Sequence, residues 1–176
     1  MYDRGNFAEN EFLAGRLDEA IRLSIEAIAM AAERGELPSL RVWRSNHCVF
    51  LCAAGRFAEA RGLALQIIED LREAGLGAVL TFAIWTLAEV TEARGRSAES
   101  AAITAYVRGR LASEGFARDE IHELQAHSFE ARLRSRLDET ALARAAELAA
   151  TWNENTAIDF ALAASAPAFD SAIATS

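Results

Sequence analysis

The chain contains no lysine, only two prolines and two cysteines, and ten glycines in 176 residues. Because proline and glycine interrupt helices, their scarcity beside abundant alanine and leucine predicts helix over most of the chain. β-branched residues are scattered singly rather than alternating with polar residues in short runs, so no strand is predicted. All 18 basic residues are arginine, which together with the alanine content indicates a GC-rich, bacterial genome.

An excess of basic residues is also lacking. The formal net charge is −8 and the pI is about 5.0, and the arginines are interleaved with acids, so direct nucleic-acid binding is not expected. The first residues do not form a charged and then apolar leader, and no secretory signal is expected. The longest apolar stretch, 79–90, includes Thr81, Thr86 and Glu89 and is too short to span a bilayer. A cytoplasmic protein without membrane contact is predicted.

Internal similarity recurs every forty residues. The four copies are GRLDEA at 15–20, GRFAEA at 55–60, GRSAES at 95–100 and SRLDET at 135–140. A second marker follows each copy by twenty residues, as Gly35, Gly75, Gly115 and Asn155. Glycine, and asparagine after it, is the usual residue just beyond a helix end. Two such markers in each period predict two helices per repeat.

The spacing of apolar residues predicts helices between these markers, most clearly from Phe57 to about Ala74. Ser135 with Asp138, and Thr151 with Glu154, have the spacing of helix-start caps. The domain prediction is one helical repeat domain over 1–162, with repeats at about 1–40, 41–80, 81–120 and 121–160. It includes a last helix at about 152–162 and a tail or linker at 163–176.

The repeat resembles the tetratricopeptide family, which has glycine between its paired helices, an apolar residue two positions later and alanine five positions later. Gly15, Leu17 and Ala20 match this pattern, as do the equivalent residues forty positions on. Small residues also occupy the family's close-packing site on the first helix of each repeat, namely Ala8, Cys48, Ala88 and Ser128. The forty-residue period is more similar to the superhelical sensor regions of MalT/LuxR-type bacterial regulators.

This resemblance implies an all-α fold, namely a right-handed α-α superhelix of four two-helix repeats followed by a short C-terminal helix. It also implies a concave groove lined by the first helix of each repeat. Transferred to this sequence, the groove positions are Val42, Ser45, Val49, Phe82, Trp85, Glu89, Glu92, His122, Gln125, Phe129 and Arg132.

Residues with catalytic or metal-binding chemistry do not cluster in the sequence. Cys48 and Cys52 lie four apart beside His47, but a structural zinc site needs four ligands and no second cluster supplies the rest. His47 and His127 occupy equivalent positions in two repeats, where Phe7 and Leu87 stand in the others, which favours packing. No nucleophile with a nearby base and no phosphate-binding loop is evident. Neither an enzyme, nor a cofactor, nor a metal site is predicted.

The predicted function is a protein-interaction or scaffold module of a bacterial regulatory or signalling protein, which binds a partner segment in the concave groove. The predicted partner-binding residues are Trp85, Glu89, Glu92, His122, Gln125, Phe129 and Arg132, because tryptophan and arginine anchor many interfaces. The alternative for Trp85 and Phe129 is that they fill the core between repeats. The alternative function is a small-molecule effector-sensing domain of a transcriptional regulator. Because no cap is evident at the solenoid ends, homodimerisation through them is a further prediction.

Overall fold

The computed structural model describes residues 3–71, 77–115 and 120–167, and within these ranges it contains helices and no strand. The expectation of an all-helical chain is therefore confirmed. The helices are α1 (Asp3–Leu13), α2 (Leu17–Glu33), α3 (Leu37–Ala53), α4 (Phe57–Leu71), α5 (Gly77–Ala93), α6 (Ser97–Glu114), α7 (Glu120–Arg136), α8 (Glu139–Ala149) and α9 (Glu154–Ala164).

The forty-residue period is visible in the helix bounds. Helices α2, α4 and α6 begin at Leu17, Phe57 and Ser97, and the helices before them end forty residues apart in the same way. The glycine between the two helices of each pair has a left-handed backbone, with φ of 77° at Gly15, and its N–H donates to the carbonyl of Phe12 at 2.9 Å. A residue with a Cβ is strained in this conformation, which explains why glycine recurs there.

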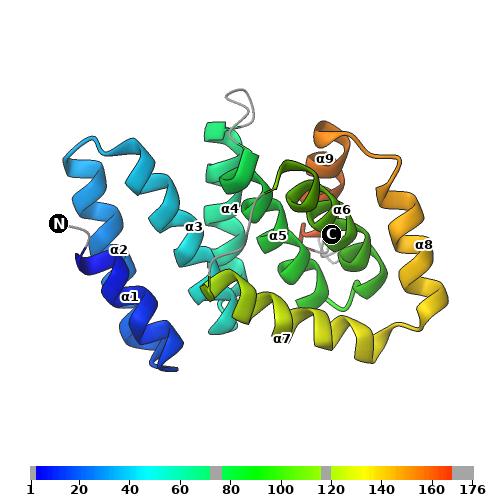
Figure 1. Cartoon of the computed structure of the whole chain (residues 1–176), viewed down its shortest axis with the longest axis horizontal. Coiled ribbons are helices and arrows are strands. Elements are labelled where there is room, and N and C mark those ends of the chain that lie inside the picture. The colour runs from blue at the N-terminus through cyan, green and yellow to red at the C-terminus, as the bar shows by residue number, and fades with distance from the viewer. Residues whose placement is uncertain (1–2, 72–76, 116–119, 168–176) are drawn as a thin grey trace, which may run out of the picture.

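Helices α1 to α6 pack each against the next along the chain (Figure 1). Small side chains lie at the close contacts, where Ala20 and Ala60 are fully buried at equivalent places. Ser100 occupies this position in the third pair and is also fully buried. Its hydroxyl donates to the carbonyl of Ala88 at 2.8 Å, so the buried polar group has a hydrogen-bond partner. Serine at the position of the two alanines thus preserves the close packing.

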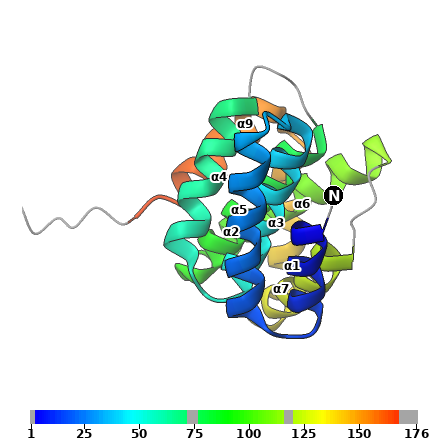
Figure 2. The same cartoon turned by 90° about the vertical axis from the view of Figure 1, so that its left-hand side faces the viewer.

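Helix α7 departs from this succession. It lies crosswise to its neighbours in Figure 1, and in Figure 2 it is on the side of α1 and α3, away from α2 and α4. Its place beside α6 is taken by α8, while α9 packs against α5 and α6. Ser128, expected at a close-packing site, is exposed. The prediction that 121–160 forms a fourth repeat like the other three is therefore not confirmed.

Among the described residues the core consists of two large hydrophobic clusters and a small one of three alanines on α6 and α8, and α7 contributes to both large clusters. The N-terminal cluster contains Phe12 and Phe50, whose ring centroids are 5.0 Å apart, together with Ile121 from α7. The larger cluster is built on α3 to α6 and α9 and includes Phe129 and Leu133 from α7. A helix with apolar contacts in both clusters ties the first pair of helices to the third.

At the starts of α8 and α9 the capping residues differ from the two that were predicted. The side chain of Asp138 accepts the N–H of Ala141 at 2.7 Å, so Asp138 rather than Ser135 caps α8. The side chain of Asn153, rather than Thr151, caps α9. Both cap residues have an extended backbone, and the side chain of each accepts the backbone N–H of the residue three positions later, as N-cap side chains do.

The other predictions for this end of the chain are met in part. Asn155, expected beyond a helix end, lies inside α9, and α9 runs to Ala164 rather than Leu162. At this helix end Arg96 Nη1 donates to the carbonyl of Ala164 at 3.0 Å, and a cation there complements the helix dipole. Within the predicted tail, 168–176 lies outside the described residues. No helix among the described residues is long and apolar enough to cross a membrane.

Candidate functional site

Most of the residues predicted to line a groove meet in an interface between α7 and the face made by α3 and α5, whereas Val42 is 43% exposed. The rings of Trp85 and Phe129 lie edge to face with centroids 5.5 Å apart, and both side chains belong to the core. His122 stacks on Phe82 at 4.0 Å, and its Nε2 lies 3.5 Å from the hydroxyl of Ser45. Ser45, Phe82 and Trp85 are thus in contact with residues predicted on α7.

Glu89 lies at the centre of this interface and is only 2% exposed. Its carboxylate accepts a hydrogen bond from Trp85 Nε1 at 3.1 Å and another from Gln125 Nε2 at 2.6 Å, and Arg132 Nη2 is 3.7 Å away. Burial raises the pKa of Glu89 to about 7, and the Gln125 bond and the charge of Arg132 only partly oppose this effect. The carboxyl group that joins α5 to α7 therefore changes its charge near neutral pH.

This titration predicts a stability that depends on pH. Unfolded Glu89 has a pKa near 4.5, so its contribution to folding is complete below pH 4.5 and is lost as the pH rises towards 7. Compared with Glu89→Gln, the wild type is expected to lose roughly 3 kcal/mol of unfolding free energy between about pH 4.5 and pH 8. Urea unfolding at several pH values measures this difference.

The matched control for this experiment is Glu147→Gln, because Glu147 is exposed on α8. Its pH profile is expected to follow that of the wild type. If Glu89→Gln also shows the wild-type profile, Glu89 is not a buried group that titrates near neutral pH.

A cavity of about 510 Å3 opens next to Glu89, at the C-terminal ends of α3 and α5. It is lined by Cys52, Ala53, Gly55, Phe57, Glu89, Glu92, Ala93, Gln125, Ser128, Arg132 and Arg136. Four of the seven predicted site residues therefore border one cavity, namely Glu89, Glu92, Gln125 and Arg132. Its size falls within the range of pockets that hold small ligands.

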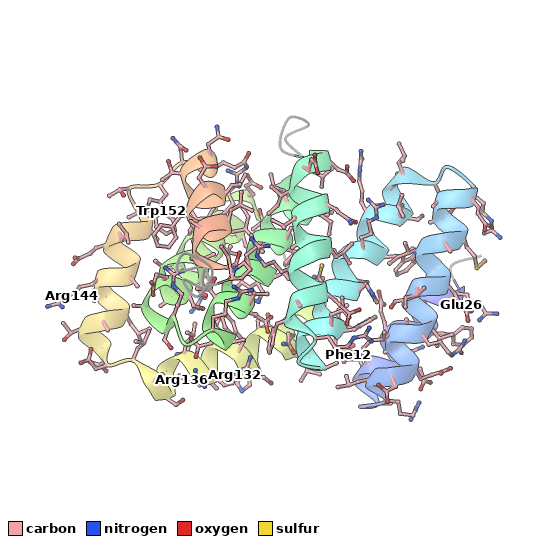
Figure 3. The ribbon with its side chains drawn as sticks, turned by 180° about the vertical axis from the view of Figure 1, so that it is seen from behind. Phe12, Glu26, Arg132, Arg136, Arg144 and Trp152 are labelled. Atoms are coloured by element: carbon pink, nitrogen blue, oxygen red, sulfur yellow. The ribbon has the colours of Figure 1, made fainter. Side chains whose placement is uncertain are left out.

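Arg132 and Arg136 lie one turn apart on α7 at the mouth of this cavity, and Figure 3 shows them next to each other on that helix. Their side chains are about half exposed, at 45% and 52%. Arg136 was not among the predicted residues. Its position four residues after Arg132, at the arginine of the fourth repeat marker, was the signal available in the sequence.

The cysteines have no reactive character in this fold. Both thiols are buried, and burial raises the pKa of Cys48 to about 12 and that of Cys52 well above its usual value. Thiolates, which are the nucleophilic and metal-binding form, are therefore disfavoured at both positions. Among the described residues, no group of three or more histidine, cysteine or acidic side chains is placed to hold a metal ion.

The histidines at equivalent repeat positions differ from each other. Half-buried His47 has its Nδ1 2.6 Å from the hydroxyl of Ser24, which itself donates to the carbonyl of Ile21. Burial lowers the pKa of His47 to about 4, so this ring is neutral at physiological pH. His127 is exposed, and the expectation that both histidines pack into the structure is wrong for His127, because α7 turns a different face towards the core.

The structure therefore brings the predicted site residues together as a helix–helix interface with an adjoining cavity. Whether these residues bind a partner stays a prediction, and so does the resemblance to tetratricopeptide and MalT/LuxR-type sensor repeats. Comparisons with protein families, with curated proteins and with solved structures find no match for this chain.

Proposed function

We propose that the chain is a protein-interaction module of a bacterial regulatory or signalling protein, built as a right-handed superhelix of tetratricopeptide-like repeats. In this proposal a partner segment docks where α7 crosses α3 and α5, with Arg132 and Arg136 as contact residues. The proposal is of a binding protein rather than an enzyme. Dimerisation through the first and last helices remains a separate prediction.

The observation that carries the proposal is that this face already holds a helix. Helix α7 is bound there by an aromatic anchor, Phe129 on Trp85, and by a polar contact from Gln125 to a buried carboxylate. Protein interfaces commonly use this combination of a buried aromatic core and a polar rim. A surface that binds one helix through side chains is suited to bind a partner segment beside it.

The exposed side of α7 offers the contacts that a partner needs. Arg132 and Arg136 extend half-exposed guanidinium groups at the cavity mouth, and Leu124 on the same helix is 48% exposed. Arginine forms paired hydrogen bonds with carboxylates, and an exposed apolar side chain further along the same helix adds buried area. An acidic segment with one or more apolar residues is the partner chemistry that fits this surface.

The test begins by identifying the partner through cross-linking of the full chain and continues with titration of the purified pair. We expect Arg132→Glu and Arg136→Glu each to weaken binding by about tenfold or more, since each replaces an attraction by a repulsion. Arg144→Glu, on the solvent face of α8 (Figure 3), is the matched control and should bind as the wild type does. Equal affinity in all three variants would exclude this surface.

A second candidate function is the sensing of a small-molecule effector, and the cavity beside Glu89 specifically favours it. The cavity reaches from the ends of α3 and α5 to α7, so a bound molecule would contact both the repeat face and the helix that crosses it. Such a ligand would favour whichever position of α7 it fits better. Native mass spectrometry of the purified chain tests this candidate by detecting a copurified small molecule.

A further inference from the structure

The cavity between α3, α5 and α7 contains a buried carboxylate whose hydrogen bonding is incomplete. Glu92 lines the cavity and is 3% exposed. Arg136 Nη1 lies 2.7 Å from Oε1 of Glu92, close enough for an ion pair but outside hydrogen-bond geometry. In the part of the chain that the structure describes, neither carboxylate oxygen receives a hydrogen bond. Such a group is costly to bury, and it normally has a donor as its partner.

The surroundings of Glu92 favour a positive charge in the inner part of the cavity. Helices α3 and α5 end at Ala53 and Ala93, and both residues line the cavity. The C-terminus of a helix carries partial negative charge, so these two helix ends act in the same direction as the carboxylate of Glu92. A protonated amine has three N–H donors and a full positive charge, so it could donate a hydrogen bond to each of the two Glu92 oxygens, which accept none.

The mouth of the cavity favours the opposite charge. Arg132 and Arg136 lie there with half-exposed guanidinium groups. Arg136 pairs with Glu92 through Nη1 alone, and its side chain is half-exposed, so the guanidinium has further N–H donors for a second carboxylate. A purely cationic ligand would be repelled by these two arginines, whereas a ligand with an anionic group next to its amine would pair with them.

We propose that this cavity binds a small zwitterion, with its protonated amine on Glu92 and its carboxylate on Arg132 and Arg136. Free α-amino acids and short peptides carry these two groups a few bonds apart. The side chains of Phe57, Cys52 and Ala93 supply an apolar wall for the carbon skeleton of the ligand. The inference rests on the effector-sensing candidate function and assigns its chemical class.

The test uses the purified full chain and two sets of probes, the twenty common L-amino acids and a set of dipeptides. We expect at least one of them to bind saturably below about 10 mM in calorimetry or ligand-observed NMR. Its amide, which lacks the carboxylate charge, and its N-acetyl form, which lacks the amine charge, should each bind about tenfold more weakly or worse. The two sets of probes distinguish a free amino acid from a peptide end as the natural source.

Glu92→Gln provides a second readout. It should reduce binding of the best probe by about tenfold or more and at the same time raise the melting temperature of the ligand-free protein, since it removes a buried charge without hydrogen-bond donors. A purely structural ion pair with Arg136 predicts the reverse, a lower melting temperature and unchanged binding. Glu33→Gln, at the exposed end of α2, is the control and should change neither quantity.

Two results would overturn the proposal. If no amino acid or dipeptide binds, the zwitterion assignment is wrong, and native mass spectrometry of the same protein then decides whether the chain binds any other small molecule. If a probe binds but its affinity is the same in Glu92→Gln, the chain senses an effector and the chemistry assigned to Glu92 is wrong. The second result leaves the effector-sensing function in place, so the two failures are distinguishable.

Discussion

Ala60→Glu is expected to abolish the cooperative thermal transition, or to lower the unfolding free energy by about 4 kcal/mol or more. Ala60 is fully buried where α4 packs on α3, and its carbonyl lies 4.0 Å from the thiol of Cys48. A glutamate there would put an unpaired charge between two helices that approach closely because both side chains are small. Since folded domains are stable by only about 5–15 kcal/mol, much of the margin would be lost.

The control for this prediction is Ala58→Glu, two residues away in the same helix. Ala58 is exposed, so this variant adds the same charge and the same helix propensity without entering the contact. It should melt within about 2 °C of the wild type. If Ala60→Glu melts like Ala58→Glu, the helix pairs do not pack at the alanine five residues after each glycine.

Phe129→Ala is expected to lower the unfolding free energy by about 3–5 kcal/mol, the range for truncating a buried phenylalanine. Phe129 has no exposed surface and anchors α7 by its contact with Trp85. Loss of this anchor should also weaken the hydrogen bond from Gln125 to Glu89. The amides of α7 should then exchange faster with solvent, while those of α2 to α4 stay protected.

Urea unfolding and hydrogen exchange measure the two parts of this result. Leu124→Ala is the control on the same helix, since Leu124 is 48% exposed, and it should change stability by no more than about 0.5 kcal/mol. If Phe129→Ala is as stable as Leu124→Ala, α7 does not lie on α5. If it instead destabilises all helices equally without local loss of protection in α7, α7 is an integral member of the stack.

Local signals in the sequence were sufficient for the first three helix pairs. The left-handed conformation at Gly15, Gly55 and Gly95 is a property of single residues, and glycine adopts it without the penalty of a Cβ. Helix starts forty residues apart at Leu17, Phe57 and Ser97 follow from these turns. The buried alanines beyond them follow from helical periodicity, which also depends on a few neighbouring residues only.

The helix caps show where such local reasoning reaches its limit. Ser135 and Asp138 are both favourable cap residues, and so are Thr151 and Asn153. In each case the residue nearer to the helix is the cap, with an extended backbone and a side chain that accepts an N–H. The choice depends on where the preceding helix ends, and α7 continues to Arg136, three residues further than the repeat requires.

In the candidate site, too, some features follow from the sequence and others only from tertiary contacts. The structure brings Trp85, Glu89, Gln125, Phe129 and Arg132 near one another. The sequence groups them because the resemblance implies that the first helix of each repeat faces a common side. The sequence alone could not decide whether these residues line an open groove or close on each other. That depends on the direction of α7, which is determined by contacts between residues far apart in the chain.

What the sequence by itself determined is the helical content, the forty-residue period and the small residues between paired helices. Each of these arises from interactions within a turn or a single helix. Only the tertiary structure decided that α7 crosses the array, because Ile121 and Phe129 each bury their side chains in a different cluster. It also decided that Glu92 and Arg136, forty-four residues apart, meet at one cavity. Such pairings depend on the balance of packing over the whole chain, which no short stretch of sequence contains.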